Sequence, residues 1–572
     1  MSGLFLHTVH LTLEAISPLA IGSGEKELIH RKRSKRSDKT AQGKEVLEDV
    51  EVSGIIRDAN NLPTIPGSSW QGVVRRLLAE ARGEQAMKAI LGNEDGGHHA
   101  NGQAGLVTCG WGLVHDKHDQ AVSPLPGDVA LNDPILGFLG GTFALLRDHV
   151  ALNHLGSTEG HRKFQIMAVP KGTRFSIGLS MTGNEEAVAA LTEVARMFRH
   201  PRFGLGGGTR RGYGRLALIR ASVGSASLSD PASIRELRRK KASDLLATDL
   251  LQSATFAVPE DTATHAKLNL TFHDAVRFGV PLDHAARAAA VTSLLEGTGG
   301  VREVADGKGF LQDRADARAE EKNALLMLQE PWISYTAVDG NHTGRLCLVE
   351  RVTGLAPELK SELRFPVKAT SIKGPIVHRM VFKDNRKNGR TINVDEWLDL
   401  PSEEQAGKLA AYATRSDDLA RFLGSPKQKL GSEGPAPEGS AARFLFDDSE
   451  VEAEWIMAID HVAIDRLSGS ARDQSGMLFH EEVLYNAKLS LALSILPPRG
   501  RTDSGPDCWG ADVRDAFLGA LKDLCTGRLP LGARSLGACS GSISWHGGKA
   551  EEWQNVAVSK GLASAVRLEE NT

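Results

Sequence analysis

Alternation of apolar and polar positions predicts two similar β-strands, one near the start of the chain and one near its middle. Residues 9–13 read Val-His-Leu-Thr-Leu, and residues 268–272 read Leu-Asn-Leu-Thr-Phe. A period of two buries one face of each strand in a core. Each strand is followed by a long polar stretch that shows neither the two-residue period of a strand nor the 3.6-residue period of a helix. We therefore expect irregular structure there.

Two amphipathic helices are predicted behind these polar stretches, in similar phrases at residues 62–76 and 365–379. Each phrase ends a strand, passes Ser or Thr residues of the kind that cap helices, and continues with apolar positions three and four apart. A later helix in each half, at 185–199 and 513–524, leads into a glycine-rich loop. The apolar stripes are Trp70, Val73, Val74 and Leu77 in the first helix, and Ile372, Ile376, Val377 and Met380 in its counterpart.

The order of these features repeats, which predicts a tandem duplication. Each half reads as strand, helix, middle strands, helix, glycine loop and last strand. This order fits an α+β fold of two tandem ferredoxin-like (RRM-type) βαββαβ domains with large insertions. The expected boundaries are 1–222 for the first domain, 223–265 for a linker with a basic helix at 234–251, 266–550 for the second domain with a disordered loop near 424–442, and 551–572 for a polar tail.

Composition narrows the class of protein. The chain has 572 residues, with 68 Lys and Arg against 71 Asp and Glu, so its formal net charge is −3. This balance argues against a uniformly basic nucleic-acid coat but is compatible with local basic surfaces. Five scattered cysteines form no disulfide framework, and no apolar run reaches the ~18–20 residues of a membrane span. The chain start lacks the pattern of a secretory signal, so we expect a cytoplasmic protein.

The glycine loop of the first half is the strongest candidate for ligand binding. Residues 203–215 read Phe-Gly-Leu-Gly-Gly-Gly-Thr-Arg-Arg-Gly-Tyr-Gly-Arg. A dinucleotide fingerprint needs a strand before the loop and a helix after it, whereas the predicted order here is the reverse. Two interpretations remain. The segment is either a β-turn without a ligand, or a loop whose amides, with Arg210, Arg211 and Arg215, hold phosphates of a nucleic acid.

The motif order resembles the RAMP superfamily of CRISPR-associated proteins. That family is marked by a glycine-rich turn after the first strand, a Pro-Gly-Ser-Ser-x-x-Gly helix start and a late glycine-rich loop. This chain has Ile-Gly-Ser-Gly at 21–24, Pro-Gly-Ser-Ser-Trp-Gln-Gly at 66–72 and the loop at 203–215. The second half has a looser Lys-Ala-Thr-Ser-Ile-Lys-Gly at 368–374. The whole is similar to a fusion of two backbone (seventh-class) subunits of a type III effector complex.

The resemblance implies a guide-RNA-binding subunit. Backbone subunits of this family polymerise along a CRISPR guide RNA, grip its phosphates and displace a base at regular intervals. The resemblance also implies a magnesium-dependent endoribonuclease that cuts complementary target RNA through an acidic residue in the loop after the first strand. The implied partners are guide RNA, target RNA, other RAMP subunits and the large signature subunit of a type III complex, with no membrane.

The first half departs from the family at its acidic residue. In the family the catalytic Asp stands six residues before a second Asp that ends an apolar-apolar-basic-Asp string. Asp58 ends such a string here, but Val52 holds the sixth position. Asp49 is the preferred alternative in the loop at 25–54. The other interpretations are Asp38, Glu48, Glu51, or no catalysis in this half.

The second half has a longer loop at the corresponding place. Asp339 is preferred as its catalytic residue because it lies beside His342 and nearer the helix start. Asp306 and Asp274 are the alternatives. Asp306 and Asp339 each precede a glycine, and Asp-Gly is also a common turn signal.

Basic residues and residues at helix starts are the candidate RNA contacts. The run at 31–36 is either a phosphate-binding segment, which gains affinity by counterion release, or a solvated charge run. Helix starts offer free backbone amides to phosphates, although capping explains the serines equally well. The candidates are Arg31, Arg33, Arg36, Ser68, Ser69, Arg76, Gly206, Gly207, Arg210, Arg211, Lys373, His378, Arg379 and Arg534.

A structural zinc site is a further hypothesis. Cys109, His115 and His118 are ligand types that suit zinc, but their spacing matches no strict zinc finger. A polar surface loop with incidental histidines is the alternative interpretation.

Two other functions remain open at this stage. One is a purely structural guide-RNA-binding subunit without catalytic activity, in which the candidate aspartates are turn residues. The other is an enzyme that binds a nucleotide or phosphate at the glycine loop, which would bind a mononucleotide tightly without partners.

Overall fold

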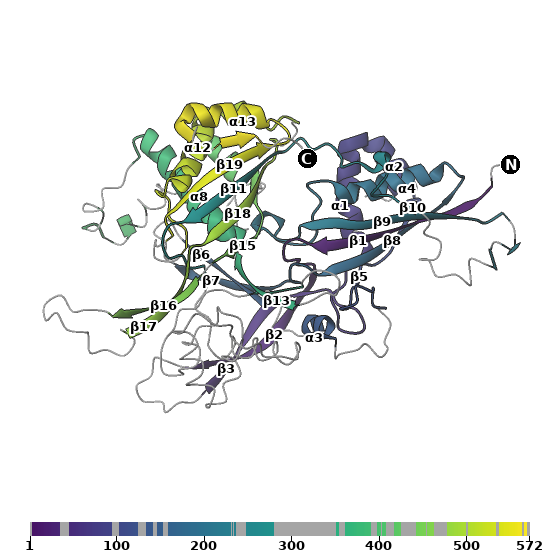
Figure 1. Cartoon of the computed structure of the whole chain (residues 1–572), viewed down its shortest axis with the longest axis horizontal. Coiled ribbons are helices and arrows are strands. Elements are labelled where there is room, and N and C mark those ends of the chain that lie inside the picture. Colours follow the sequence, from purple (N-terminus) through teal and green to yellow (C-terminus); the bar gives the residue numbers. More distant parts are fainter. Residues whose placement is uncertain are drawn as a thin grey trace.

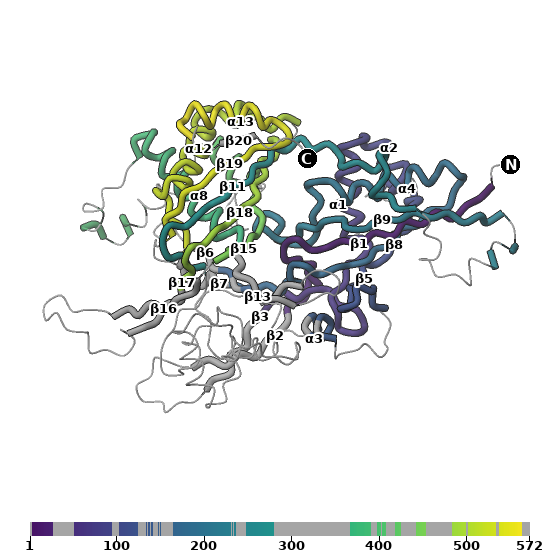
Figure 2. The backbone as a smooth tube through the Cα atoms, viewed as in Figure 1, coloured from purple at the N-terminus to yellow at the C-terminus, as the bar shows by residue number. Residues whose placement is uncertain are grey.

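The structure is a computed structural model that describes most of the chain. Figure 1 shows two lobes, each with a β-sheet covered by helices. The colours in Figure 2 separate them in sequence, with purple to teal in the first lobe (3–256) and teal to yellow in the second lobe (264–568). The described residues are 3–34, 45–93, 102–123, 133–140, 146–152, 158–229, 231–232, 234–235, 248–278, 350–353, 361–390, 397, 399–401, 403–405, 407, 417–424, 442–453, 455–462, 478–498, 502–532, 537–562 and 566–568.

The sheet of the first lobe is built around the predicted first strand, β1 (Phe5–Ala15). β1 pairs antiparallel with β8 (Arg174–Gly183) on one side and with β9 (Leu216–Ser227) on the other. Its alternate residues Val9, Leu11 and Leu13 are fully buried, as the period of two requires. The remaining strands are β4 (Val107–Cys109) and β5 (Leu113–Val114), which pair with β8, and β10 (Thr248–Asp249), which pairs with β9.

Helices cover one face of this sheet (Figure 1). They are α1 (Gly67–Arg82), α2 (Glu84–Leu91) and α4 (Ala187–Arg196). The stripe predicted for α1 lies in the core, where Trp70 packs against Phe198 with ring centroids 5.3 Å apart. The apolar period of α1 therefore sets which side of the helix meets the sheet.

The sheet of the second lobe is built around β11 (Thr264–Phe272), the other predicted strand. β11 lies between β18 (Lys488–Ile495) and β19 (Cys539–His546), again antiparallel to both. The sheet also contains β12 (Glu350–Thr353), β13 (Ser361–Val367), β14 (Phe444–Phe446), β15 (Ser449–Glu452) and β20 (Val566–Leu568). Its helices are α8 (Ala369–Lys387), α11 (Asp417–Leu423), α12 (Ala511–Cys525) and α13 (Ala550–Ala557). The chain is thus a mixed α/β protein with largely antiparallel sheets.

Two further sheets extend from the lobes toward the lower part of Figure 1. One has the order β2-β3-β7-β6, and the other is the β16–β17 hairpin. The strands are β2 (Gly22–Ser34), β3 (Glu45–Ile55), β6 (Leu146–Leu152), β7 (Thr158–Met167), β16 (Trp455–Val462) and β17 (Leu478–Tyr485), and a short helix, α3 (Pro134–Gly140), lies near β2 in the view. The segment 25–54, expected to be irregular, therefore contains a β-hairpin.

Neither predicted helix start is capped by a Ser or Thr side chain. α1 begins after Pro66, without a side-chain cap, so Ser68 and Ser69 lie inside its first turn. α8 begins after Lys368, and the amide of Ala369 donates instead to the distant Asp448 carboxylate, at 2.8 Å. The capping prediction was wrong because Pro66, which has no capping group, occupies the cap position of α1, and the Asp448 carboxylate accepts from the first amide of α8.

Two predictions about the connecting segments also need correction. Thr248 and Asp249 form the strand β10, so the basic helix expected at 234–251 does not extend to its predicted end. The expected polar tail contains α13, whose Trp553 is fully buried, and β20, which pairs parallel with β19. Apolar residues among the charges of that segment explain why it folds onto the second lobe. Most of the loop predicted near 424–442 lies outside the described residues.

Candidate nucleic-acid interface

The glycine loop of the first lobe is held against the chain that follows β1. Gly207 N–H donates to the Ala20 carbonyl, and Gly214 N–H donates to the Pro18 carbonyl, both at 2.7 Å. Gly206 has a φ of +79°, and a Cβ there would lie 2.3 Å from the Ala20 oxygen. Only glycine fits this close approach. The glycine loop therefore packs on the backbone of residues 18–20, which lead into the Ile-Gly-Ser-Gly turn at 21–24.

This loop meets the second lobe at Asp448. The Asp448 carboxylate accepts hydrogen bonds from Arg147 of β6, at 2.6 Å, and from the Ala369 amide at the start of α8. A Cβ on Gly212 would lie 2.2 Å from the same carboxylate. Asp448 thus fills the N-terminus of α8, where an anion is favoured, and fixes the glycine loop beside that helix.

Three basic side chains converge where the loop and α8 meet. Arg76 comes from α1, Arg210 from the glycine loop and Lys373 from the first turns of α8. They are close enough that the charge of Arg76 adds to burial in lowering the pKa of Arg210, and the charge of Arg210 does the same for Lys373. We call these three residues the basic junction. Within the described part of the chain, no ion pair neutralises any of them.

Lys373 is the most constrained member of the basic junction. Burial, and then the nearby charge of Arg210, lower its pKa to about 8. Its Nζ donates to the Phe444 carbonyl at 3.3 Å and lies 4.8 Å from the centre of the Phe444 ring. A half-buried ammonium facing other cations is unfavourable unless an anion joins it. The basic junction therefore has the electrostatics of an anion-binding site.

Other predicted RNA contacts lie in several places. Gly206 and Gly207 line the glycine loop, whereas Arg211, next to Arg210, places its guanidinium over the Phe164 ring. His378 is exposed on α8. Arg379 is engaged inside the second lobe, where it pairs with Asp523 at 2.9 Å and donates to the Arg528 carbonyl.

The remaining candidates lie either in the β2–β3 hairpin or outside the described residues. Arg31 and Arg33 lie in β2, and Asp49 lies in β3, opposite His30 in the register of the two strands. Arg36, Asp339 and Arg534 lie outside the described residues. The sequence therefore placed the first catalytic candidate in a loop, whereas the structure has it in a strand.

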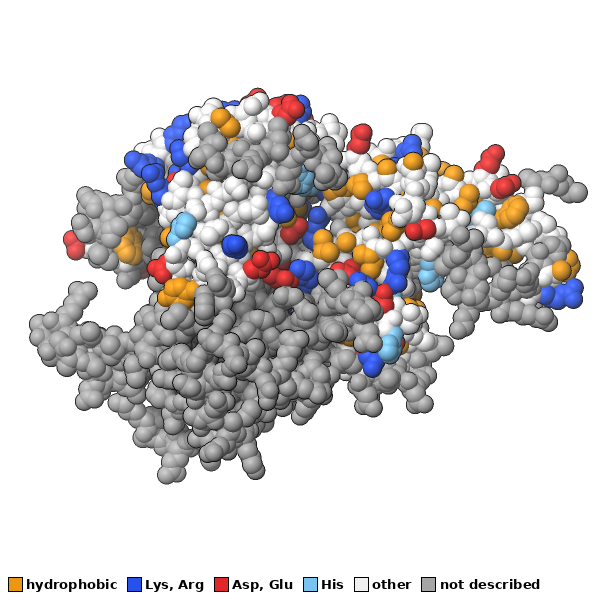
Figure 3. Space-filling view, in the orientation of Figure 1, with side chains coloured by type: hydrophobic (Ala, Val, Ile, Leu, Met, Phe, Trp, Pro, Cys, Tyr) orange, Lys and Arg blue, Asp and Glu red, His pale blue; other side chains and the backbone are white. Residues whose placement is uncertain are grey.

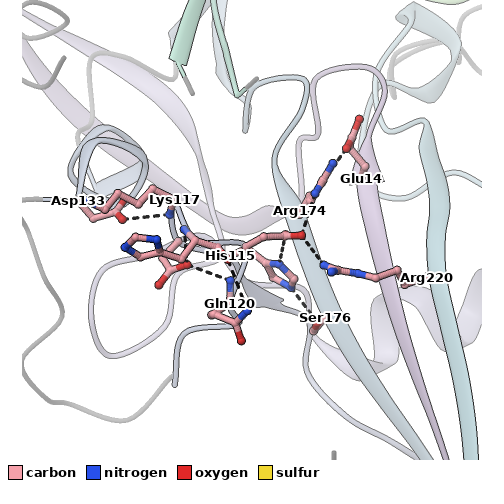
Figure 4. A network of polar contacts seen from close by, with 11 residues as sticks. Glu14, His115, Lys117, Gln120, Asp133, Arg174, Ser176 and Arg220 are labelled. Carbon is pink, nitrogen blue, oxygen red and sulfur yellow. Dashed lines mark hydrogen bonds and ion pairs between the residues drawn. The ribbon is translucent and has the colours of Figure 1, made fainter. Parts of the chain in front are cut away.

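Of the residues proposed for zinc, His115 has both ring nitrogens bound to other side chains. Figure 4 shows His115 directed toward Ser176, to which its Nε2 is bound at 2.8 Å. Its Nδ1 lies 2.7 Å from the Asp119 carboxylate. Burial raises the pKa of the Cys109 thiol to about 11, and the thiol donates to the Val107 carbonyl at 3.6 Å. No cluster of three or more His, Cys, Asp or Glu residues suited to a metal occurs in the described parts of the chain.

The network around His115 instead joins strands of the first lobe. Arg174 and Arg220 both bind Asp119, at 2.9 and 2.6 Å, and Arg174 also binds Glu14 at 2.8 Å (Figure 4). Burial lowers the pKa of His115, so the neutral ring is favoured. These contacts give the segment after β5 a structural role.

Several residues around the glycine loop were missed by sequence reasoning. Tyr213, Arg147, His149, Phe164 and Asp448 contact one another in a chain from the first lobe to the second. Figure 3 shows basic and acidic side chains side by side where the lobes meet, with hydrophobic side chains next to them.

No helix of the described chain is both long and apolar enough for a membrane crossing. Comparison with known proteins gives three findings. Residues 12–217 match the model of the RAMP superfamily, and no curated protein sequence matches the chain. One similar solved structure is a cryo-EM structure of the type III-B Cmr-beta bound to cognate target RNA, with 18% identity and a TM-score of 0.24. The similarity covers 38% of this chain and 60% of that one.

Proposed function

We propose that this protein is a member of the RAMP superfamily and a guide-RNA-binding backbone subunit of a type III CRISPR effector complex. The family match extends from β1 to the start of β9 and includes the glycine loop. The observation that carries the RNA-binding proposal is the basic junction. Arg76, Arg210 and Lys373 lie on three separate elements and form a local positive surface on a chain of net charge −3. RNA phosphates would offset their mutual repulsion.

The second lobe is proposed to be a second RAMP domain. In the first lobe β1 lies between β8 and β9, and in the second β11 lies between β18 and β19. Each lobe also has a helix before its glycine-rich segment and a strand after it. These parallels support a duplicated βαββαβ unit, in which α8 is the counterpart of α1.

Cleavage of complementary target RNA is part of the proposal. Asp49 of β3 and Asp339 are the acidic residues assigned to it, with a bound magnesium ion to neutralise charge at the phosphate. Asp49 stands opposite His30 in the β2–β3 register, so a carboxylate and an imidazole belong to neighbouring positions of one hairpin. Asp49→Asn and Asp339→Asn would each remove one cut from a complementary RNA. Unchanged cleavage patterns in both variants would support a structural subunit whose neighbours do the cutting.

The primary test is the RNA that copurifies when the chain is expressed with its genomic neighbours. A discrete RNA with repeat-derived sequence is expected. Protein that assembles with its neighbours but carries no nucleic acid would overturn the proposal and favour a small-ligand role for the glycine loop, tested by mononucleotide binding.

A second test isolates the basic junction. Replacing Arg76, Arg210 and Lys373 together with Gln removes three phosphate contacts, so the slope of log affinity against log salt should become shallower by about 2 for single-stranded RNA. A matched control replaces three exposed basic residues that already have acidic partners. These control residues are Lys88, Lys387 and Arg421. Equal salt slopes in both variants would contradict the assignment of the RNA path.

A further inference from the structure

One short segment of the second lobe, residues 444–448, touches both α8 and the glycine loop. It contains β14 and leads into β15. The Phe444 carbonyl accepts a hydrogen bond from Lys373 Nζ at 3.3 Å, and the Phe444 ring lies 4.8 Å from the same nitrogen. At the other end of the segment, the Asp448 carboxylate lies beside Gly212 of the glycine loop. We call residues 444–448 the spacing segment, because it joins the loop to the helix that carries Lys373.

The contact between the spacing segment and the loop is a direct backbone contact. Gly212 follows the single helical turn Thr209–Arg211 and has a φ of +91°. A Cβ at this position would overlap both Asp448 Oδ1 and the Ala369 Cβ, so only glycine fits. The turn that carries Arg210 therefore ends against the carboxylate.

Asp448 is held in place by both lobes. Its side chain is 5% exposed and accepts hydrogen bonds from the Ala369 amide of α8, at 2.8 Å, and from Arg147 of the first lobe, at 2.6 Å. The Arg147 guanidinium also lies 5.1 Å from the centre of the ring of Tyr213, the residue after Gly212. Because Arg147 compensates its charge, Asp448 can be buried beside the loop in one position.

The first lobe holds the same loop through two other backbone contacts. Gly207 N–H donates to the Ala20 carbonyl, and Gly214 N–H donates to the Pro18 carbonyl. These bonds fix the loop before and after the turn of Arg210. The contact with Asp448 then sets how far that turn lies from α8.

This separation matters because the basic junction consists of like charges. Cations on a chain that is free to move separate, which lowers the positive potential that a phosphate meets. If the protein holds Arg210 and Lys373 together before RNA arrives, RNA binding does not have to supply the cost of ordering them.

We propose that Asp448 is a positioning residue for RNA binding, which makes the phosphate site at the glycine loop of the first lobe dependent on the second lobe. It acts by holding the turn of Arg210 beside Lys373. This inference rests on the proposed function and deepens it. Asp448 itself contacts the protein and not the RNA.

The test measures binding of a fluorescent single-stranded oligouridylate over a range of salt concentrations. Asp448→Asn and Gly212→Ala disturb the contact from its two sides, and Gly212→Ala changes no charge. Each should weaken binding about 10- to 100-fold, as expected for one lost hydrogen bond to a charged group. The slope of log affinity against log salt should become shallower by about 0.7, because Arg210 no longer meets its phosphate.

The double variant shows whether the two changes act through one contact. Asp448→Asn together with Gly212→Ala should bind RNA no more weakly than the weaker of the two single variants. Losses that add in the double variant would overturn the proposal, because they would mean that the two residues act separately.

A second ion pair across the same boundary provides the matched control. Glu450 binds Lys171 of the first lobe at 2.7 Å but makes no contact with the glycine loop that the structure describes. Glu450→Gln should leave both the affinity and the salt slope unchanged. If Glu450→Gln and Asp448→Asn weaken binding equally, loosening of the boundary and not the position of Asp448 controls affinity, and the proposal is wrong.

A milder change covers the case in which Asp448→Asn does not fold. Arg147→Lys keeps a cation beside the carboxylate, whereas Arg147→Met removes it. The salt slope of Arg147→Lys should stay closer to that of wild type, with folding of each variant checked by tryptophan fluorescence. Wild-type slopes in both folded variants would contradict the positioning role.

The same measurements separate failure of this inference from failure of the proposed function. If wild type binds the oligouridylate and the variants bind it with the same affinity and slope, the positioning role is wrong and the proposed function survives. If wild type binds neither the oligouridylate nor copurifying RNA, both proposals fail.

Discussion

The buried ion pair between Arg147 and Asp448 is expected to contribute strongly to the stability of the lobe boundary. The two side chains are only 4% and 5% exposed and lie 2.6 Å apart. Asp448 also binds the Ala369 amide of α8. Arg147→Met would leave the carboxylate buried with part of its compensation removed. Breaking such a pair typically costs about 3–5 kcal/mol.

A second ion pair across the same boundary serves as the control. Lys171 and Glu450 are 2.7 Å apart but 42% and 26% exposed. Solvent screens such a pair, so its loss should cost about 0–1 kcal/mol. Both ion pairs join the same two lobes, so they differ mainly in how deeply their charged side chains are buried.

The assay is a double-mutant cycle on urea unfolding, followed by tryptophan fluorescence. Arg147→Met, Asp448→Asn and the double variant give the coupling energy of the buried pair, and Lys171→Met, Glu450→Gln and their double give that of the exposed pair. We expect about 2 kcal/mol or more for the first and less than about 1 kcal/mol for the second. Equal coupling energies would refute the reasoning that burial sets the strength of these contacts.

Four further predictions concern the glycine loop and individual titratable residues. Gly206→Ala should destabilise the first lobe by about 2 kcal/mol or more in urea unfolding, because its φ is +79° and the new Cβ meets a carbonyl. As a control, Gly72→Ala has open space around it and should stabilise α1 by about 0.5–1 kcal/mol. A change of the same sign in both variants would contradict the packing of the loop. RNA affinity should weaken as the pH rises through about 8, since Lys373 then loses its charge, and Lys373→Arg should abolish this dependence. Burial lowers the pKa of His200 from 6.5 to about 4, so its stabilising contribution is complete above pH 6.5 and is lost as the pH falls toward 4. His200→Gln should therefore flatten the dependence of the unfolding free energy on pH between these values. A curve that is only displaced, with the same slope as wild type, would argue against this role of His200. Burial raises the pKa of Asp261, but its hydrogen bond to His265 and the charge of Arg202 prevail and lower it to about 2, so acid unfolding should steepen further below pH 4 in wild type and less so in Asp261→Asn.

The central strands and main helices were predictable because their periods are local. Residues 9–13 and 268–272 alternate cleanly, and both lie in inner strands that pair on both sides. The order of helix, glycine loop and strand at 185–227 was also predicted, which excluded a dinucleotide fold. In these segments side-chain period alone determines the buried face.

The β2–β3 hairpin was not predictable from either strand alone. Both strands are rich in charge, which is depleted in strands generally. Pairing brings Arg31 opposite Glu48 in the register, and Lys26 binds Glu51. Complementary charge across the strands favours a hairpin that each segment, taken separately, does not indicate.

The contacts between the two lobes could not be predicted from the sequence for a related reason. Asp448 contacts Arg147, 301 positions earlier in the chain, and Ala369, 79 positions earlier. Nothing in the local sequence distinguishes this aspartate from its neighbour Asp447. The basic junction was predicted residue by residue, but the packing of the loop on α8 determines that its members share one place.

The covalent connection from β9 to β11 has a consequence for assembly. It joins the lobes in one chain, and Arg202 of the first lobe binds Asp261, in the segment just before β11, at 2.7 Å. Two lobes in one polypeptide meet at an effective concentration in the millimolar range, so a polar boundary held by a few ion pairs is sufficient to keep them together. The same connection fixes a one-to-one ratio and a single order of the two lobes. Separate subunits would need a larger, more selective interface to achieve both.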